Sequence, residues 1–125
     1  YLNYPAGFFG ALSFYYASSV PLTINLYDGL NGSGALLAST TFPATPVPGG
    51  VFSVWEIASM PFSGIAKSVI FVGVENQSGF DDVTLGSATP GGSPAPLTPL
   101  PAWMFLLVFS LMLGYVVFRT VRSAA

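Results

Sequence analysis

Residues 22–42, LTINLYDGLNGSGALLASTTF, decide the fold predicted for this chain. Leu22, Ile24 and Leu26 alternate with more polar residues, which is the two-residue period of a strand with one buried face. The glycine- and asparagine-rich run at residues 28–34 tolerates the positive φ angles that a chain reversal needs. Residues 36–42 supply a second strand, so the stretch predicts strand, turn and strand.

Four more short strands are expected outside this stretch, at residues 11–17, 51–60, 67–74 and 80–85. The most apolar of them, residues 67–74, is expected at the centre of the sheet. Six strands with turns every eight to twelve residues, and no helical period among them, predict an all-β domain, an antiparallel β-sandwich or jelly roll. Side chains expected to point inward include Leu12, Phe14, Tyr16, Phe52, Val54 and Ile57.

The C-terminal part of the chain predicts a single transmembrane helix. Residues 102–118, AWMFLLVFSLMLGYVVF, contain no charge and no proline, and as a helix they span roughly 25 Å, near the low end for a bilayer core. Arg119 and Arg122 follow at once and mark where the helix leaves the lipid on the cytoplasmic side. The alternative, a buried helix of a soluble domain, needs a larger protein around it.

The chain is therefore divided into an ectodomain at residues 1–86, a flexible Pro/Gly/Ser/Thr linker at 87–101, the helix at 102–118 and a basic tail at 119–125. The first residue is Tyr1 and no signal peptide precedes the strands. A domain placed outside the cytoplasm needs one. We therefore expect a processed or partial form whose β-domain is N-terminally incomplete.

The charged residues exclude several classes of function. They make up 6% of the chain, against ~25% in ordinary soluble proteins. The part before Ala102 has five acidic residues and one lysine, a net charge of minus four, so nucleic-acid binding is not expected. The chain has no His and no Cys, which removes Ser-His, Cys-His and His-metal chemistry. The sequence predicts that the protein is not an enzyme.

The tail resembles a known family of sorting signals. Pro99, Leu100, Pro101 and Ala102 precede the apolar run, and the two arginines follow it. This order resembles the PEP-CTERM class of bacterial signals, in the VPLPA-CTERM variant that has Leu where the name-giving Glu stands. Residues 22–39 and 66–87 are similar to strand stretches of ectodomains that precede such tails. Thr98 departs from the pattern, since Val is usual at that place.

The resemblance implies an exported protein of a Gram-negative bacterium that produces exopolysaccharide. An exosortase, a membrane-embedded cysteine transpeptidase, is expected to recognise the tail near residues 99–101 and remove the helix. The β-domain is then expected in the periplasm while the helix sits in the lipid of the inner membrane, and at the cell surface or outside the cell after processing. The predicted function is a non-catalytic structural role linked to the envelope or exopolysaccharide.

The alternative function is a carbohydrate-binding module on the same β-sandwich. Tyr15, Tyr27 and Trp55, with Tyr16 beside them, are the candidates for a platform on which sugar rings stack. In a small sandwich such aromatic residues more often fill the core or cover an edge. The two hypotheses differ in whether these side chains line one exposed groove.

Two carboxylate stretches are weighed as cation sites, with no other cofactor expected. Asp81 and Asp82 resemble an Asp-Asp stretch that helps to hold a structural cation in jelly-roll ectodomains, and Ca²⁺ needs six to eight oxygens. The alternative is that one Asp caps the preceding turn and the other faces water. Asp28, with Asn31 and Ser33, is only faintly similar to a calcium loop, so a plain hairpin turn is expected there.

Overall fold

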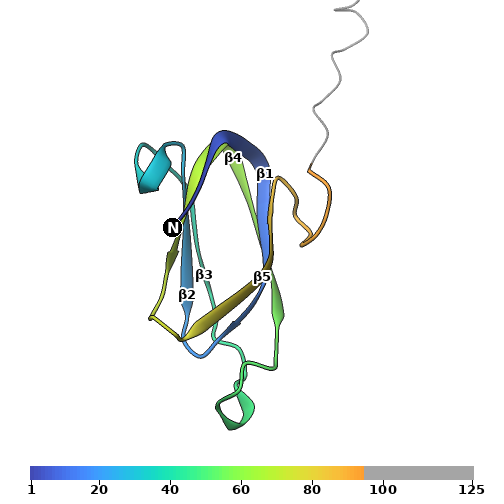
Figure 1. Ribbon diagram of the computed structural model, residues 1–125. Coiled ribbons are helices and arrows are strands. Elements are labelled where there is room, and N and C mark those ends of the chain that lie inside the picture. The colour runs from blue at the N-terminus through green and yellow to red at the C-terminus, as the bar shows by residue number, and fades with distance from the viewer. Residues whose placement is uncertain (95–125) are drawn as a thin grey trace, which may run out of the picture. The chain divides into compact units, whose positions relative to one another are not determined.

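Five antiparallel strands form one sheet in the computed structural model, which describes residues 1–94 (Figure 1). The order across the sheet is β3-β2-β4-β1-β5, and two 3₁₀ turns, η1 (Leu30–Gly32) and η2 (Pro48–Gly50), lie in the connections. The prediction of an all-β, antiparallel domain is confirmed. The strands are β1 (Leu2–Ser18), β2 (Leu22–Tyr27), β3 (Leu36–Phe42), β4 (Glu56–Val72) and β5 (Ser78–Leu85).

The two longest strands, β1 and β4, bend and take part in both halves of the sheet. Residues 10–16 of β1 pair with residues 56–62 of β4, and residues 2–3 pair with 68–69. Between these ladders the register shifts around Phe8, where Gly7, Gly10 and Gly64 have φ angles of 77°, 92° and 93°. Only glycine adopts such angles without strain, so these three residues allow the sheet to fold over.

The bend divides the sheet into two halves that face each other, as in a sandwich (Figure 1). In the first, which we call the β2 half, β3 pairs with β2, and β2 pairs with residues 68–72 of β4. The start of β1 pairs with the same part of β4 and completes this half. In the second, the β5 half, β5 pairs with residues 12–18 of β1, and residues 56–62 of β4 lie on the other side of β1. Each half has one face toward the core and one toward the outside.

The core lies between the halves and is centred on Phe14 of the β5 half. The Phe14 ring packs edge-on against three other rings. The distances between ring centroids are 5.7 Å to Phe42 and 6.1 Å to Phe71, both from the β2 half, and 5.7 Å to Phe80 of β5. Burying each such side chain contributes about 1.5–3 kcal/mol. The predicted inward residues of residues 11–17 and 22–28 are confirmed as fully buried: Leu12, Phe14, Tyr16, Leu22, Ile24 and Leu26.

One strand replaces two of the predicted ones. Residues 51–60 and 67–74 were expected as separate strands, but β4 runs without a break from residue 56 to 72 and includes Pro61. The N-terminal part of β4 pairs only with β1 among the described residues, so the missing N–H of Pro61 can face away from the ladder. The expectation that the sheet centre lies at residues 67–74 agrees with the central place of β4.

The predicted inward direction of Ile57 is wrong. Its side chain is 60% exposed, while Ala58 and Met60 are buried. The register explains this, because Ala58 and Met60 lie opposite the inward residues Phe14 and Leu12, and paired residues project to the same face.

Residues 87–94, the first part of the predicted linker, lie against the outer face of the β5 half. The Ser13 hydroxyl donates a hydrogen bond of 2.8 Å to the carbonyl oxygen of Ser87, and the Gly91 N–H donates one of 2.8 Å to Thr84 Oγ1. Pro90 is buried. This cover explains why Ser13, which alternates outward, has no exposed surface.

Candidate functional site

Two of the three candidate sugar-stacking residues share the outer face of the β5 half. Tyr15 lies directly opposite Ile57 on β4 and Asp81 on β5. Trp55 comes just before β4, and its ring covers Gly79, where an added Cβ would be 3.2 Å from Trp55 Cη2. Trp55 is 43% exposed and Ile57 60%. The face therefore presents an aromatic and aliphatic surface with one carboxylate.

Tyr27, the third candidate, lies on the other side of the domain. It alternates with the buried Ile24 and Leu26 on β2, so it projects from the outer face of the β2 half. Its ring lies near Gly32 of the β2–β3 connection. The structure thus brings Tyr15 and Trp55 onto one face and does not bring Tyr27 to them.

Tyr16 belongs to the core and is not part of any platform. It is 1% exposed, and its hydroxyl donates a hydrogen bond to the Pro43 carbonyl oxygen at 3.1 Å. Burial raises the pKa of the Tyr16 phenol above its ordinary value, and the nearby Glu56 carboxylate raises it further. Tyr16 therefore has a structural role in the core, which is the alternative to sugar binding that the sequence analysis gives for such aromatic residues.

The carboxylates of Asp81 and Asp82 sit at a bulge of β5. The β1–β5 register shifts between Ser13 and Tyr15, and Asp82 has a φ angle of 48°. Asp81 Oδ1 accepts the Asp82 N–H at 2.9 Å, so one carboxylate oxygen stabilises the bulge itself. Both side chains are exposed.

Within residues 1–94 no group of three or more His, Cys, Asp or Glu side chains gathers as a metal site. Ca²⁺ binding at Asp81 and Asp82 stays a prediction. Further oxygen ligands, such as backbone carbonyls, would have to join these two carboxylates, because calcium takes six to eight oxygens.

Asp28 closes the β2–β3 connection. Its Oδ1 accepts the Ala35 N–H at 2.7 Å, and the Ser33 hydroxyl donates to the Leu30 carbonyl oxygen at 2.6 Å. Asp28 Oδ1 and the Ser33 hydroxyl thus take part in the turn, and Asn31 Oδ1 accepts a hydrogen bond from Asn3 Nδ2 at 2.6 Å, as expected for a plain hairpin turn. The connection also covers the β2 half, since the Gly32 N–H donates to Ser68 Oγ at 2.9 Å.

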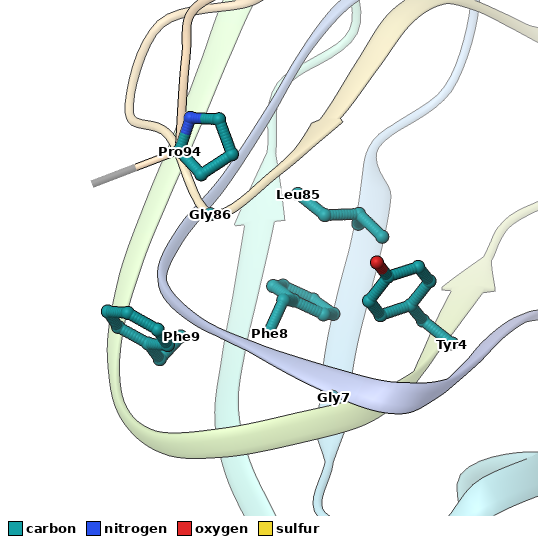
Figure 2. Close-up of a pocket in the computed structure, with 7 residues that line it drawn as sticks. All are labelled: Tyr4, Gly7, Phe8, Phe9, Leu85, Gly86 and Pro94. Carbon is teal, nitrogen blue, oxygen red and sulfur yellow. The ribbon is translucent and has the colours of Figure 1, made fainter. Parts of the chain in front are cut away.

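A pocket of about 220 Å³ lies where the bend of β1 meets the end of β5 (Figure 2). Figure 2 shows the Tyr4 and Phe8 rings side by side, with the Leu85 side chain above them. Sequence reasoning missed it, because the alternation used to find strands does not locate the bend. The glycines at positions 7 and 10 are the signal in the sequence that marks it. The lining residues are Tyr4, Gly7, Phe8, Phe9, Leu85, Gly86 and Pro94.

The remaining predicted sites lie outside the described residues. These are the sorting motif at Pro99, Leu100, Pro101 and Ala102, the apolar run at residues 102–118, and the basic residues Arg119 and Arg122. Among residues 1–94, no helix has the length and apolar character that crossing a membrane requires.

Comparisons with known proteins give no relative from which a function could be transferred. No family model matches the chain, and neither the curated proteins nor the solved structures contain a match. The functional argument therefore rests on the residues and their arrangement.

Proposed function

We propose that this chain is an exported, non-catalytic structural protein of the cell surface or extracellular matrix, delivered there by its C-terminal sorting signal. An exosortase-type transpeptidase in the inner membrane is its processing partner, with the β-domain in the periplasm before processing. A jelly-roll arrangement of the β-domain is part of this proposal. A link between the protein and the exopolysaccharide of the producing cell is also part of the proposal.

The observation that carries the proposal is the order of features along the chain. The segment after β5 still contacts the β-domain at Gly91, which donates a hydrogen bond to Thr84. The Pro99–Ala102 motif begins less than ten residues after Gly91. An uncharged run of residues 102–118 follows, closed by Arg119 and Arg122. This order supports the proposal, because a proline-marked motif, an apolar run long enough for a membrane helix and a basic end are the parts of the sorting signals that the tail resembles.

The arrangement of the β-domain supports a structural part over a binding one. Tyr15, Tyr27 and Trp55 do not form one groove, and Trp55 covers Gly79 of β5.

The intact mass of the protein recovered from an exosortase-bearing host tests the proposal. The mature species is expected to end near Pro101, in the medium or on the cell surface. Exchange of both motif prolines, Pro99→Ala with Pro101→Ala, is expected to leave a full-length species in the membrane. Pro96→Ala, a proline outside the motif, is the matched control and is expected to be processed normally. A full-length, membrane-extracted wild-type protein would overturn the proposal.

A second candidate function is supported by one observation, the shared face of Tyr15 and Trp55. Sugar rings stack on exposed aromatic side chains, and Asp81, opposite Tyr15, adds a hydrogen-bond acceptor for hydroxyl groups. Titrating the protein with the host polysaccharide in a Trp103→Phe background makes Trp55 the only tryptophan reporter. Carbohydrate binding predicts a fluorescence change that Tyr15→Ala removes and Tyr27→Ala leaves intact. No change across the accessible range refutes this function.

A further inference from the structure

The outer edge of β3 carries no charge and no proline, and its one irregularity is a register shift at Leu37, near the start of the strand. Among the described residues β3 pairs only with β2, and its sequence, LLASTTF, contains no proline and no charge. Leu36 is 54% exposed, and Ser39 and Thr41 are also exposed. An uncharged edge of this length offers a row of backbone N–H and C=O groups to a partner strand.

The other open edges of the described sheet are each blocked. β5 carries the adjacent charges of Asp81 and Asp82 and a bulge. The first part of β4 contains Glu56 and Pro61, and the first part of β1 contains Pro5 and two register shifts. Charges, prolines and bulges are the devices by which proteins prevent edge pairing. Among these open edges β3 alone has neither a charge nor a proline, and its register is regular over residues 38–42, which makes this part of the edge the available one.

We propose that β3 pairs edge to edge with β3 of a second copy of this chain, antiparallel about a twofold axis. Such an interface is self-complementary, because the same strand supplies both sides. The proposal rests on the strand edges and their charges, and it does not depend on the sorting signal or on the structural function proposed above.

The charge distribution favours a second copy at this edge. Residues 1–94 carry five acidic residues and Lys67, so two copies repel each other over most of their surface. No charged residue lies between Asp28 and Glu56, and the Asp28 carboxylate accepts the Ala35 N–H. Pairing through β5 would instead bring Asp81 and Asp82 of both copies together, and like charges across strands are destabilising. β3 is the edge at which two copies meet without opposed carboxylates.

Cysteine cross-linking of the full chain tests this pairing, because the protein has no cysteine of its own. Ser39→Cys places one thiol in the middle of β3, and a short bis-maleimide is expected to join two such chains covalently. Ser59→Cys, an exposed serine on the blocked edge of β4, is the matched control and is expected to give little dimer. Equal yields from the two positions, or none from Ser39→Cys, overturn the proposal.

A charge placed on the edge separates strand pairing from association through another part of the chain. In the Ser39→Cys background, Thr41→Lys is expected to lower the cross-linked fraction about fivefold, because lysine is the residue that guards natural edges. Thr23→Lys is the control. The Thr23 and Thr41 hydroxyls share a hydrogen bond of 2.8 Å, so this substitution removes the same bond but places its lysine on β2, one strand away from the edge. A loss of cross-linking with both lysines to the same extent would contradict pairing through β3.

Discussion

The phenolic hydroxyl of Tyr16 donates a hydrogen bond to the backbone carbonyl oxygen of Pro43 across 3.1 Å. This bond joins β1 to the chain that follows β3. Two more bonds continue the connection, from the Thr45 N–H to the Ser18 carbonyl oxygen at 2.7 Å and from the Ser18 N–H to Thr45 Oγ1 at 2.9 Å. The proline-rich loop therefore ties the β2 half to the β5 half at the end of the domain opposite the bend.

Removing the Tyr16 hydroxyl is expected to weaken this tie. Tyr16→Phe keeps the ring in the core and loses one hydrogen bond, so the free energy of unfolding falls by about 1 kcal/mol. Urea denaturation followed by far-UV circular dichroism measures it. Tyr15→Phe is the control, because Tyr15 lies on the outer face of the β5 half, opposite Ile57 and Asp81, and a change below about 0.5 kcal/mol is expected there. Equal losses would show that the bond to Pro43 does not stabilise the domain.

The same residue predicts a loss of stability at alkaline pH. Burial, and then the Glu56 carboxylate, raise the Tyr16 pKa above the ordinary 10.0, so the folded state keeps a proton that the unfolded state releases. This contribution is fully present below the unfolded pKa and is lost as pH rises through the folded pKa. Wild type is expected to lose more stability than Tyr16→Phe between about pH 9 and pH 12. Parallel stability curves for the two proteins would contradict the assignment.

Phe14 is expected to be the most costly core position to truncate. Its ring contacts aromatic rings from β3, β4 and β5, so Phe14→Ala leaves a cavity between the two halves of the sheet and costs about 3–5 kcal/mol. Phe9→Ala is the matched control, since Phe9 is 41% exposed and its loss is expected to cost about 1 kcal/mol or less. Thermal unfolding of the two variants beside wild type distinguishes them. A Phe14→Ala protein as stable as Phe9→Ala would place the core elsewhere.

Alternation within a strand predicted the core of this domain well. Leu22, Ile24 and Leu26 are buried because a regular strand places every second side chain on one face. The wrong prediction at Ile57 departed from this rule, because alternation from Phe52 and Val54 places residues 58 and 60 on the inner face and Ile57 on the outer one, as the structure has them. The prediction of two separate strands was wrong because Pro61 lies within β4 and does not end a strand. A proline is compatible with a strand that has a free edge, and the sequence does not say which edges are free.

The candidate site could not be assembled from the sequence for a related reason. Periodicity shows that Tyr15 and Tyr27 both project away from the core, but a folded sheet has two outer faces. Which face each residue occupies depends on the bend at Gly7, Gly10 and Gly64. That bend arises from long-range pairing of β1 with β4, and local patterns do not contain this information.

The β2–β3 connection offers a prediction on whether Asp28 acts as a structural hydrogen-bond acceptor. Gly34 has a φ angle of 78°, and a Cβ at this position would collide with Asp28 Oδ1 and lie 3.2 Å from the Gly29 nitrogen. Gly34→Ala therefore adds backbone strain of about 1–2 kcal/mol and displaces the carboxylate that accepts the Ala35 N–H, a further loss of about 1 kcal/mol.

Gly49→Ala, in the turn η2 between β3 and β4, provides the matched comparison. Its φ angle is 62°, and an added Cβ would meet nothing within 4 Å, so only the strain of about 1–2 kcal/mol is expected. Chemical denaturation of both variants, and of each combined with Asp28→Ala, measures the difference. Because Asp28→Ala removes the colliding carboxylate, the two glycine variants should then become equally costly. A difference that persists without the Asp28 side chain would show that another contact, and not this carboxylate, closes the connection.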